Sequence, residues 1–497
     1  MPPLGCYSVG SRMSITLTGL VLIPLGIFAF LARPRWLFAL AVFFAPFSAT
    51  SLINVGSGDT GSGLQPSIFL GGLMLLRFAL ESTYRMRISL PTAIRKPLLL
   101  VFLFVAVCSV SLIMPFIING KIQVMTAATL TAPIEPLHFR SSNITYLIGI
   151  VFGLCFAGYV ARESLGPKQF LRTLRIYLAS GVFISLWGIL QAALFAVRIP
   201  YPATVFNNSA SPYALAFDKS LESVAIPRVS SVALEPSVLS IYLVGMFPIV
   251  IAAVMGRQRI FGKYRDWMTL ALLLMTMLLT TSSIGYVTTG LLMLVMTWTL
   301  FKYGRLNAIW LLGILLLAGA GVTAAVVVPP VRGVVQEVLF NKADSYSALE
   351  RGTVVLHDAE YFQQYPVLGL GWGSAPAHDL ILGMLANTGV LGLASFVLFV
   401  GYMLRKLGKD MTHSYDSRQP FSPSHVMFLS ILATCSAYAA EGPPGGPAFW
   451  LIIGLGVAAC GQVESALGPR KTKHGWGRFL RMALRPRSSA VRLPLEG

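Results

Sequence analysis

The chain has 497 residues, of which 55% are hydrophobic and only 11% are charged. These proportions exclude a string of ordinary soluble domains and are typical of a protein that crosses a membrane many times. The formal net charge of +19 is high enough for a nucleic-acid-binding protein, but the positive residues are distributed as membrane topology requires. We therefore expect no nucleic-acid partner.

Apolar segments long enough to be membrane spans recur along the whole chain. An α-helix needs roughly 20 residues to cross the hydrocarbon core of a bilayer. The sequence predicts spans near residues 14–31, 37–54, 65–80, 98–118, 144–161, 175–197, 237–255, 267–282, 285–301, 308–328, 380–404, 425–440 and 448–464. We therefore predict an all-α fold, a polytopic transmembrane helix bundle of about 12–13 spans.

The lysines and arginines indicate how this bundle is oriented. Most of the 38 fall in alternate connections, on the side that also holds the carboxyl terminus. Short cytoplasmic loops of membrane proteins are rich in Lys and Arg, so the sequence predicts an outer amino terminus and a cytoplasmic carboxyl terminus. An even number of spans, with both ends cytoplasmic, stays open if the first two apolar segments form a re-entrant hairpin.

Three long connections fall on the predicted outer face, at residues 119–143, 198–236 and 329–379. Long loops in compact proteins are usually functional or disordered. In the last one, a short helix follows Pro329, and a second helix begins after Asp344 or Ser345 and stops before Pro366. We expect this large, partly helical loop to be a lid.

The domain organisation follows from these connections. Residues 1–465 are expected to form one bundle that includes the loops 198–236 and 329–379. Residues 466–497 are expected to form a basic cytoplasmic tail, either disordered or bound to the anionic lipid surface.

The segment before the span at 237–255 contains the first group of candidate site residues. Pro236 and Ser237 fit the first turn of that helix, and its positive dipole end would face outward together with Arg228. Glu235 either stabilises the helix start or acts as a base or a ligand of a sugar hydroxyl, and both interpretations remain open. Ser231 and Ser237 are possible substrate contacts.

The span at 380–404 repeats this arrangement. Asp379 is a candidate N-cap and substrate contact, His378 precedes it, and the lid can bring Arg351 to the same place. Two helix N-termini and two arginines predict a diphosphate site, because the guanidinium fork binds phosphate oxygens in pairs. His378 titrates near neutral pH and can therefore accept a proton from a hydroxyl.

Several other motifs admit a plain structural interpretation. The glycines of "GLGWGSAPAHDL", at 369, 371 and 373, are interpreted first as a backbone turn and second as a phosphate contact. Ser282 in "TTSSIGYVTTG" either packs helices together or contacts a sugar. His357 is a rival for the base, although a surface salt-bridge network explains it better. The five cysteines show no metal or redox spacing, and we expect neither a metal nor a cofactor.

The order of these pieces resembles the O-antigen polymerase and O-antigen ligase superfamily of bacterial envelopes. The resemblance covers about residues 140–405 and is strongest over "RGTVVLHDAEYFQQYPVLGLGWGSAPAHDLILGMLANTGVLGL". It implies glycosyl transfer, without a metal, at the periplasmic face of the inner membrane, from a glycan carried on undecaprenyl diphosphate. It also implies that Arg228 and Arg351 bind the diphosphate and that His378, or else Glu235, is the catalytic base.

We therefore expect a polymerase of lipid-linked oligosaccharide repeat units, in O-antigen or exopolysaccharide biosynthesis. An O-antigen ligase that transfers the glycan to a lipid or protein acceptor is the alternative. An exporter or flippase of lipid-linked sugar fits less well, because the sequence shows no internal repeat and no charge at the centre of a span. The expected partners are undecaprenyl-diphosphate-linked oligosaccharide, an acceptor glycan, membrane lipids, a flippase and a chain-length regulator.

Overall fold

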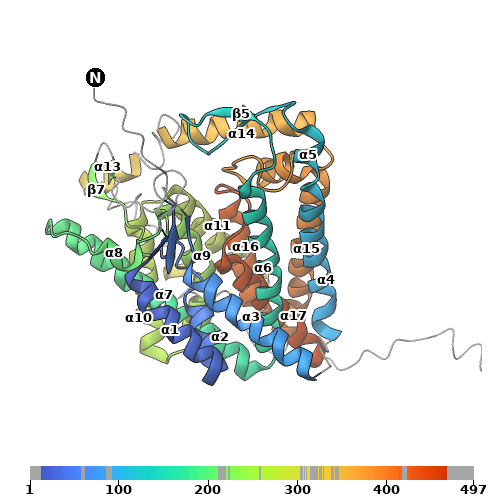
Figure 1. The fold of residues 1–497 in the computed structure, drawn as a ribbon. Helices are drawn as coiled ribbons and strands as arrows, with labels where there is room; N and C mark the ends of the chain where they lie inside the picture. Colours follow the sequence, from blue (N-terminus) through green and yellow to red (C-terminus); the bar gives the residue numbers. More distant parts are fainter. Residues whose placement is uncertain are drawn as a thin grey trace, which may run out of the picture.

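The computed structural model describes residues 13–56, 62–85, 92–210, 220–221, 224–256, 259–302, 311–313, 329–336, 346–416 and 422–466, and a few single positions between 306 and 341. The described chain is an all-α bundle of a membrane protein, with short strands near one end (Figure 1). The helices are α1 (Leu17–Ala32), α2 (Pro34–Phe43), α3 (Pro66–Arg85), α4 (Thr92–Ser111), α5 (Met114–Ile118), α6 (Ser141–Glu163), α7 (Pro167–Ala196), α8 (Ala203–Phe206), α9 (Pro236–Met255), α10 (Lys263–Thr280), α11 (Ser283–Lys302), α13 (Pro329–Val335), α14 (Tyr346–Gln364), α15 (Leu380–Asp416), α16 (Pro423–Tyr438) and α17 (Pro447–Ala466).

In the described part of the chain, six helices are long and apolar enough to cross a membrane: α4 together with α5, and α6, α7, α9, α11 and α15. Of the seven other expected spans, five coincide with α1, α3, α10, α16 and α17, and two do not. The expected span at 308–328 lies outside the described residues apart from a few positions. The one at 37–54 was wrong in extent.

That segment forms only the ten-residue helix α2, about 15 Å long at 1.5 Å per residue and therefore too short to cross a bilayer. The helix ends three residues before Pro46, which has no backbone N–H and disfavours helical geometry in the residue before it. The chain beyond it is irregular but buried in protein: Phe47 is fully buried and the Thr50 hydroxyl donates to the carbonyl of Phe206 at 2.6 Å. Apolarity alone does not distinguish such a segment from a membrane helix.

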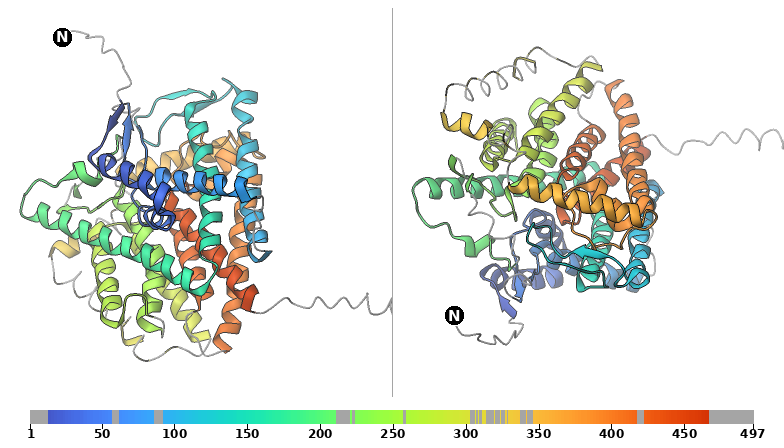
Figure 2. Two further views of the ribbon diagram at one scale, coloured as in Figure 1. Left: turned by 60° about the horizontal axis from the view of Figure 1, so that its bottom comes forward. Right: turned by 90° about the horizontal axis from the view of Figure 1, so that it is seen from above.

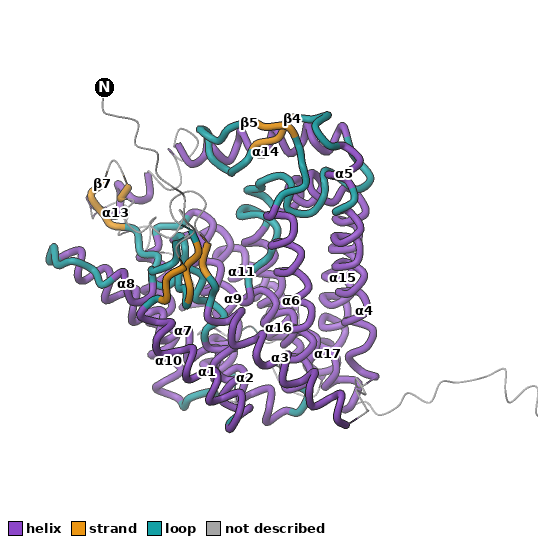
Figure 3. Tube along the Cα trace, viewed as in Figure 1, coloured by secondary structure: helices purple, strands orange, loops and turns teal. Residues whose placement is uncertain are grey.

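Within the described residues, seven strands form three small antiparallel sheets. β1 (Met13–Ile15), β2 (Ile53–Val55) and β3 (Ser62–Gly63) form one, with Met13 opposite Val55, and the other two are the pairs β4 (Gln123–Met125) with β5 (Ile134–Pro136) and β6 (Ser220–Leu221) with β7 (Val224–Pro227). β4, β5, β7, α13 and α14 lie at one end of the bundle, which we call the lid end (Figures 1 and 3). Described parts of all three long connections therefore lie at the same end of the bundle, as expected.

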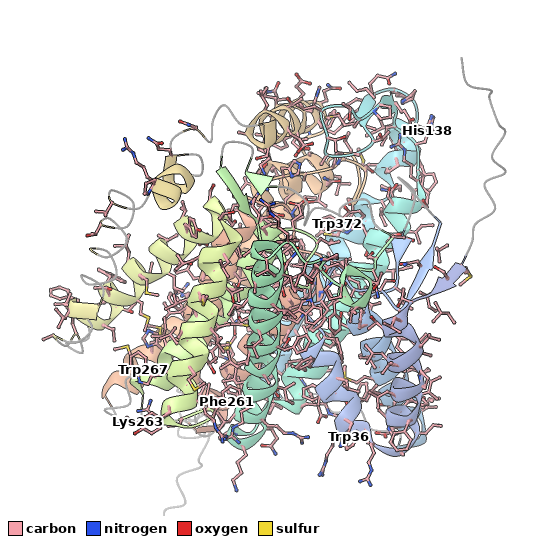
Figure 4. The ribbon with its side chains drawn as sticks, turned by 90° about the vertical axis from the view of Figure 1, so that its left-hand side faces the viewer. Trp36, His138, Phe261, Lys263, Trp267 and Trp372 are labelled. Atoms are coloured by element: carbon pink, nitrogen blue, oxygen red, sulfur yellow. The ribbon has the colours of Figure 1, made fainter. Side chains whose placement is uncertain are left out.

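The end opposite the lid carries exposed tryptophans and basic residues. Trp36 and Trp267 lie there with Lys263, whereas His138 and Trp372 lie toward the lid end (Figure 4). Both Trp36 and Trp267 are 54% exposed. Tryptophans of this kind are typical of the boundary between a membrane and water.

The described part of the lid around helix α14 is packed against other parts of the protein. Helix α14 lies across the ends of the bundle helices when the molecule is seen from above (Figure 2), and the β4–β5 hairpin packs beside it. The hydroxyl of Tyr361 on α14 accepts a hydrogen bond from the backbone N–H of Met125 on β4 at 3.2 Å. A small hydrophobic core that is separate from the main one lies beneath: Ile118, Ile122, Val124, Leu137, Tyr361, Leu370, Ala375 and Ala386.

The glycines at 369, 371 and 373 have φ values of +62°, +104° and +76°, so the turn uses conformations that other residues rarely adopt. A Cβ atom at Gly369 would lie 2.5 Å from the carbonyl oxygen of Ala386, and one at Gly371 would lie 2.6 Å from Pro115. The amide of Asn387 fixes the turn by accepting from the backbone N–H groups of residues 374 and 375, each at 3.0 Å. These glycines therefore serve the backbone turn.

A break in α15 anchors the chain that leaves α14. Gly389 has φ +63° and ψ −166° inside the helix. The break frees backbone N–H groups, and that of Val390 donates to the carbonyl of Pro366 at 2.8 Å. The polar backbone groups exposed by the break are thereby satisfied within the protein, as an apolar surrounding demands.

We expect Gly389→Ala to lower the midpoint of thermal unfolding of the purified protein in detergent. The backbone conformation of Gly389 is nearly exclusive to glycine, and a Cβ atom would collide with the carbonyl of Val367, so we expect a cost of about 1–3 kcal/mol. Gly401→Ala in the same helix is the matched control, since a Cβ atom there meets nothing within 4 Å. Equal midpoints for the two variants would contradict a structural role for the break.

Candidate functional site

The N-terminus of α9 lies at the centre of the candidate site. Other helices enclose most of α9. Of its most apolar stretch 89% is buried inside the protein, against 33% for α6 and for α11. Glu235 is the N-cap residue with extended geometry, and Pro236 occupies the first helical position, as expected. The side chain of Glu235 makes no capping hydrogen bond and lies near the hydroxyl of Ser237, at 3.3 Å.

An ion pair connects the lid helix to this place. The Nη2 atom of Arg351 on α14 lies 3.2 Å from Oε2 of Glu441, and its Nη1 group donates to the carbonyl of Ala440. Glu441 lies in the turn between α16 and α17, and its Oε1 atom lies 3.2 Å from the Ser237 hydroxyl. Three distant segments of the chain are thus joined under the lid.

The second arginine comes from the segment just after β7. Arg228 is half-buried, and its Nε–H group donates to the hydroxyl of Thr281 at 3.2 Å. It lies within electrostatic range of Glu235, Arg351 and Glu441. Burial lowers the pKa of Arg228 from its very high ordinary value, but a guanidinium keeps its charge at any physiological pH. The structure therefore brings both predicted arginines together.

Two carboxylates balance these two arginines. Burial raises the pKa of Glu441 to about 7, the charge of Arg351 opposes this rise, and Glu235 adds to it. Near neutral pH, Glu441 therefore exchanges its proton easily, and the charge of the cluster changes when it does. This cluster is therefore closer to neutral than two arginines alone would make it.

His378 lies between the glycine turn and α15, and it is half-buried. Its Nε2 atom lies 3.1 Å from the carbonyl oxygen of Ala128. A carbonyl can only accept, so Nε2 carries the hydrogen and Nδ1 is the basic atom of the neutral ring. Burial lowers the pKa of His378 and Arg351 lowers it further, whereas the hydrogen bond to Ala128 and the charges of Glu350 and Glu235 raise it, and the net shift is downward. The ring is therefore neutral at pH 7, as a general base must be.

Two of the predicted serines have structural partners. Ser231 is fully buried with a left-handed φ of +52°, and its hydroxyl donates to the carbonyl of Ile184 on α7 at 2.7 Å. Ser282 is 2% exposed and accepts from the backbone N–H of Gly285 at 3.3 Å, so it caps α11. Ser231 and Ser282 therefore position loops and helices, whereas Ser237 lies between the two carboxylates.

Asp379 caps α15, because its Oδ1 atom accepts from the backbone N–H of Leu382 at 2.7 Å. Its other oxygen is buried without a hydrogen-bond partner, as are both oxygens of Asp358 on α14. Burial, together with the charge of Asp379, raises the pKa of Asp358 from 3.8 to about 8. At neutral pH Asp358 is therefore mostly protonated, which allows the two carboxyl groups to lie at the same junction of lid and bundle.

Glu441 is the site residue that sequence reasoning missed. It is only 17% exposed at its side chain and contacts Arg351 and Ser237. The available signal is weak: a single acidic residue in the turn "EGPPGGP" between two predicted spans, at the end to which the lid returns. No spacing rule relates position 441 to position 351.

Metal binding and known relatives add no further site residue. Within the residues that the structure describes, no group of three or more His, Cys, Asp or Glu side chains lies in an arrangement that could hold a metal ion. No protein-family model matches the chain, and no curated protein matches it either. The function must therefore be inferred from the cluster itself.

We expect Asp358→Asn to remove the pH dependence of the stability with which the lid is docked on the bundle. The folded pKa of Asp358 lies above its unfolded value, so the unfolded state binds fewer protons between these values and the stability of the docked lid falls as the pH rises from about 4 to about 8. Amide hydrogen exchange in α14, corrected for intrinsic rates, measures this loss. The exposed neighbour Glu360→Gln is the control and should keep the wild-type trend. The same trend in Asp358→Asn would exclude Asp358 as its source.

Proposed function

We propose that this protein is a glycosyltransferase of a bacterial inner membrane that polymerises lipid-linked oligosaccharide repeat units at the periplasmic face, in O-antigen or exopolysaccharide biosynthesis. It would transfer the glycan from undecaprenyl diphosphate to a hydroxyl of an acceptor sugar. One observation carries this proposal: Arg351 of the lid helix pairs with Glu441, which contacts Ser237 in the first turn of α9. The charge of Arg351 also acts on Arg228 and His378. The resemblance to O-antigen polymerases and ligases supports it.

The donor diphosphate fits the chemistry of the two arginines. Guanidinium groups bind phosphate oxygens in pairs, and the N-terminus of α9 adds the positive end of a helix dipole. Negative charge grows on the diphosphate as its bond to the anomeric carbon breaks. Fixed positive groups beside it therefore stabilise the transition state more than the ground state.

The acceptor hydroxyl needs a base, and His378 is suited to this role. In the proposed reaction the hydroxyl oxygen bonds to the anomeric carbon while the diphosphate leaves with the electrons of the broken bond. The hydroxyl proton passes to Nδ1 of His378, whose other nitrogen is held by the carbonyl of Ala128. Glu235 is the alternative base.

The basic residues support the proposed orientation. Arg162 and Lys302 lie in the last turns of α6 and α11, at the ends away from the lid, and Lys263 lies at the same end of the bundle (Figure 4). Such an excess marks the cytoplasmic side of a membrane protein, so the lid end would face the periplasm. The carrier lipid would enter between helices and leave its head group under α14.

We expect purified protein, incubated with a lipid-linked repeat unit and no added metal, to form a ladder of longer products. Arg351→Ala and Arg228→Ala should each slow ladder formation by about 100-fold or more, because each removes a fixed charge beside the leaving group. Lys121→Ala removes an exposed positive charge at the same end and should have little effect. Unchanged rates in both arginine variants would contradict the proposed donor site.

A deletion strain distinguishes the alternatives. Single-repeat products indicate a polymerase, whereas full-length polymer that stays on its carrier indicates a ligase. Donor trapped in the cytoplasmic leaflet would indicate an exporter and overturn the transferase proposal.

We expect kcat/KM to rise with pH on the acidic side of its profile, with a midpoint below the usual range for histidine, because the base must be neutral and burial lowers the pKa of His378. His378→Gln should remove this rise and lower the rate by about 10²–10⁴-fold. His357→Gln is the control, since that ring stacks on Tyr361 and pairs with Glu360 on the lid helix. Retention of the rise in His378→Gln would assign the base to another residue.

A further inference from the structure

The guanidinium group of Arg351 has two partners within the protein itself. One of its nitrogens contacts the carbonyl of Ala440 and another contacts the carboxylate of Glu441. Both partners belong to the same turn, which also contacts the N-terminal turn of α9 through Ser237. An anion that binds Arg351 must therefore compete with an internal carboxylate.

Charged and titratable groups face Glu441 from every element around it. They are Arg351 on α14, Arg228 in the segment after β7, Glu235 at the start of α9, Tyr242 on α9 and Tyr438 on α16. Arg351 and Arg228 are cations, whereas Glu235 carries the same negative charge as an ionised Glu441. The side chains of Glu441 and Arg351 are 17% and 26% exposed, so a ligand can reach the ion pair.

We propose that Glu441 holds the place on Arg351 that a phosphate group of the lipid diphosphate takes over on binding, and that Glu441 takes up a proton as it is displaced. This inference rests on the proposed function. When Arg351 turns to the diphosphate, Glu441 loses its cation and stays beside Glu235 and the incoming anion. A proton from water on the Glu441 carboxyl removes this repulsion.

The exchange has two consequences for the reaction. Burial raises the pKa of Glu441 to about 7, so the proton is available near neutral pH. Binding should therefore weaken as the pH rises and the carboxylate competes more strongly for Arg351. After transfer, ionisation of Glu441 would restore the ion pair and expel the product diphosphate. The residue acts through Arg351 and is a positioning residue.

Binding of farnesyl diphosphate, a short lipid diphosphate without sugar, tests this exchange. Titration calorimetry in detergent compares wild type, Glu441→Gln and Glu135→Gln at pH 6 and pH 8. Glu441→Gln should bind about tenfold more tightly than wild type at pH 8, which corresponds to about one pKa unit, and the ratio should shrink at pH 6. Glu135→Gln breaks an exposed pair with Arg140 at the same end and should behave as wild type.

A second measurement uses only the wild-type protein, so it does not depend on the folding of a variant. Titrations in buffers of different ionisation enthalpy count the protons taken up on binding. We expect net proton uptake at pH 7.5, because Glu441 is protonated when the diphosphate displaces it. If the diphosphate only bound the arginines, its phosphate groups would instead release protons. Net release would overturn the proposal.

Turnover separates this role from catalysis by Glu441 itself. The proposal predicts a lower KM for Glu441→Gln, together with stronger inhibition by the product diphosphate, which this variant can no longer expel. A 100-fold loss of kcat with unchanged KM would make Glu441 the base and overturn it. Wild type that binds no farnesyl diphosphate at either pH would reject the diphosphate site and this inference together, whereas wild-type binding unaffected by Glu441→Gln would reject only the exchange.

Discussion

The enclosure of α9 by its neighbours is the constraint on which the arrangement of the site depends. An apolar helix that is covered on every side leaves polar groups only at its ends, and one end of α9 opens beneath the lid. Glu235 and Ser237 lie at that end because the helix starts there. The other site residues come from segments that surround the same point: the β7 segment, α14 and the turn after α16.

Much of the fold follows from the sequence because apolar length and proline positions act locally. Most expected spans became helices, the start at Pro236 was predicted, and Asp379 caps α15 as expected. The predicted span at 37–54 was wrong, because the composition of one segment does not reveal that other parts of the protein bury it as irregular chain. The convergence of Arg228 and Arg351 was anticipated only by assuming that the lid folds back.

Glu441 illustrates what local reasoning lacks. Its contacts cross 90 residues to Arg351 and 204 to Ser237, and no periodicity connects such positions. Its presence changes the electrostatics of the proposed site, since an arginine pair with internal counter-ions binds an anion by exchange. Strong attraction to a permanently exposed positive cluster would instead hold product as firmly as substrate.

The hydrogen bond between Met125 and Tyr361 joins residues 236 positions apart, and this separation has a consequence for biogenesis. A ribosome adds roughly 5–20 residues per second, so the β4–β5 hairpin waits on the order of 10 to 50 seconds before α14 is made. During that interval its apolar side chains have no helix to cover them. The lid can therefore close only late in synthesis, after much of the bundle has been inserted.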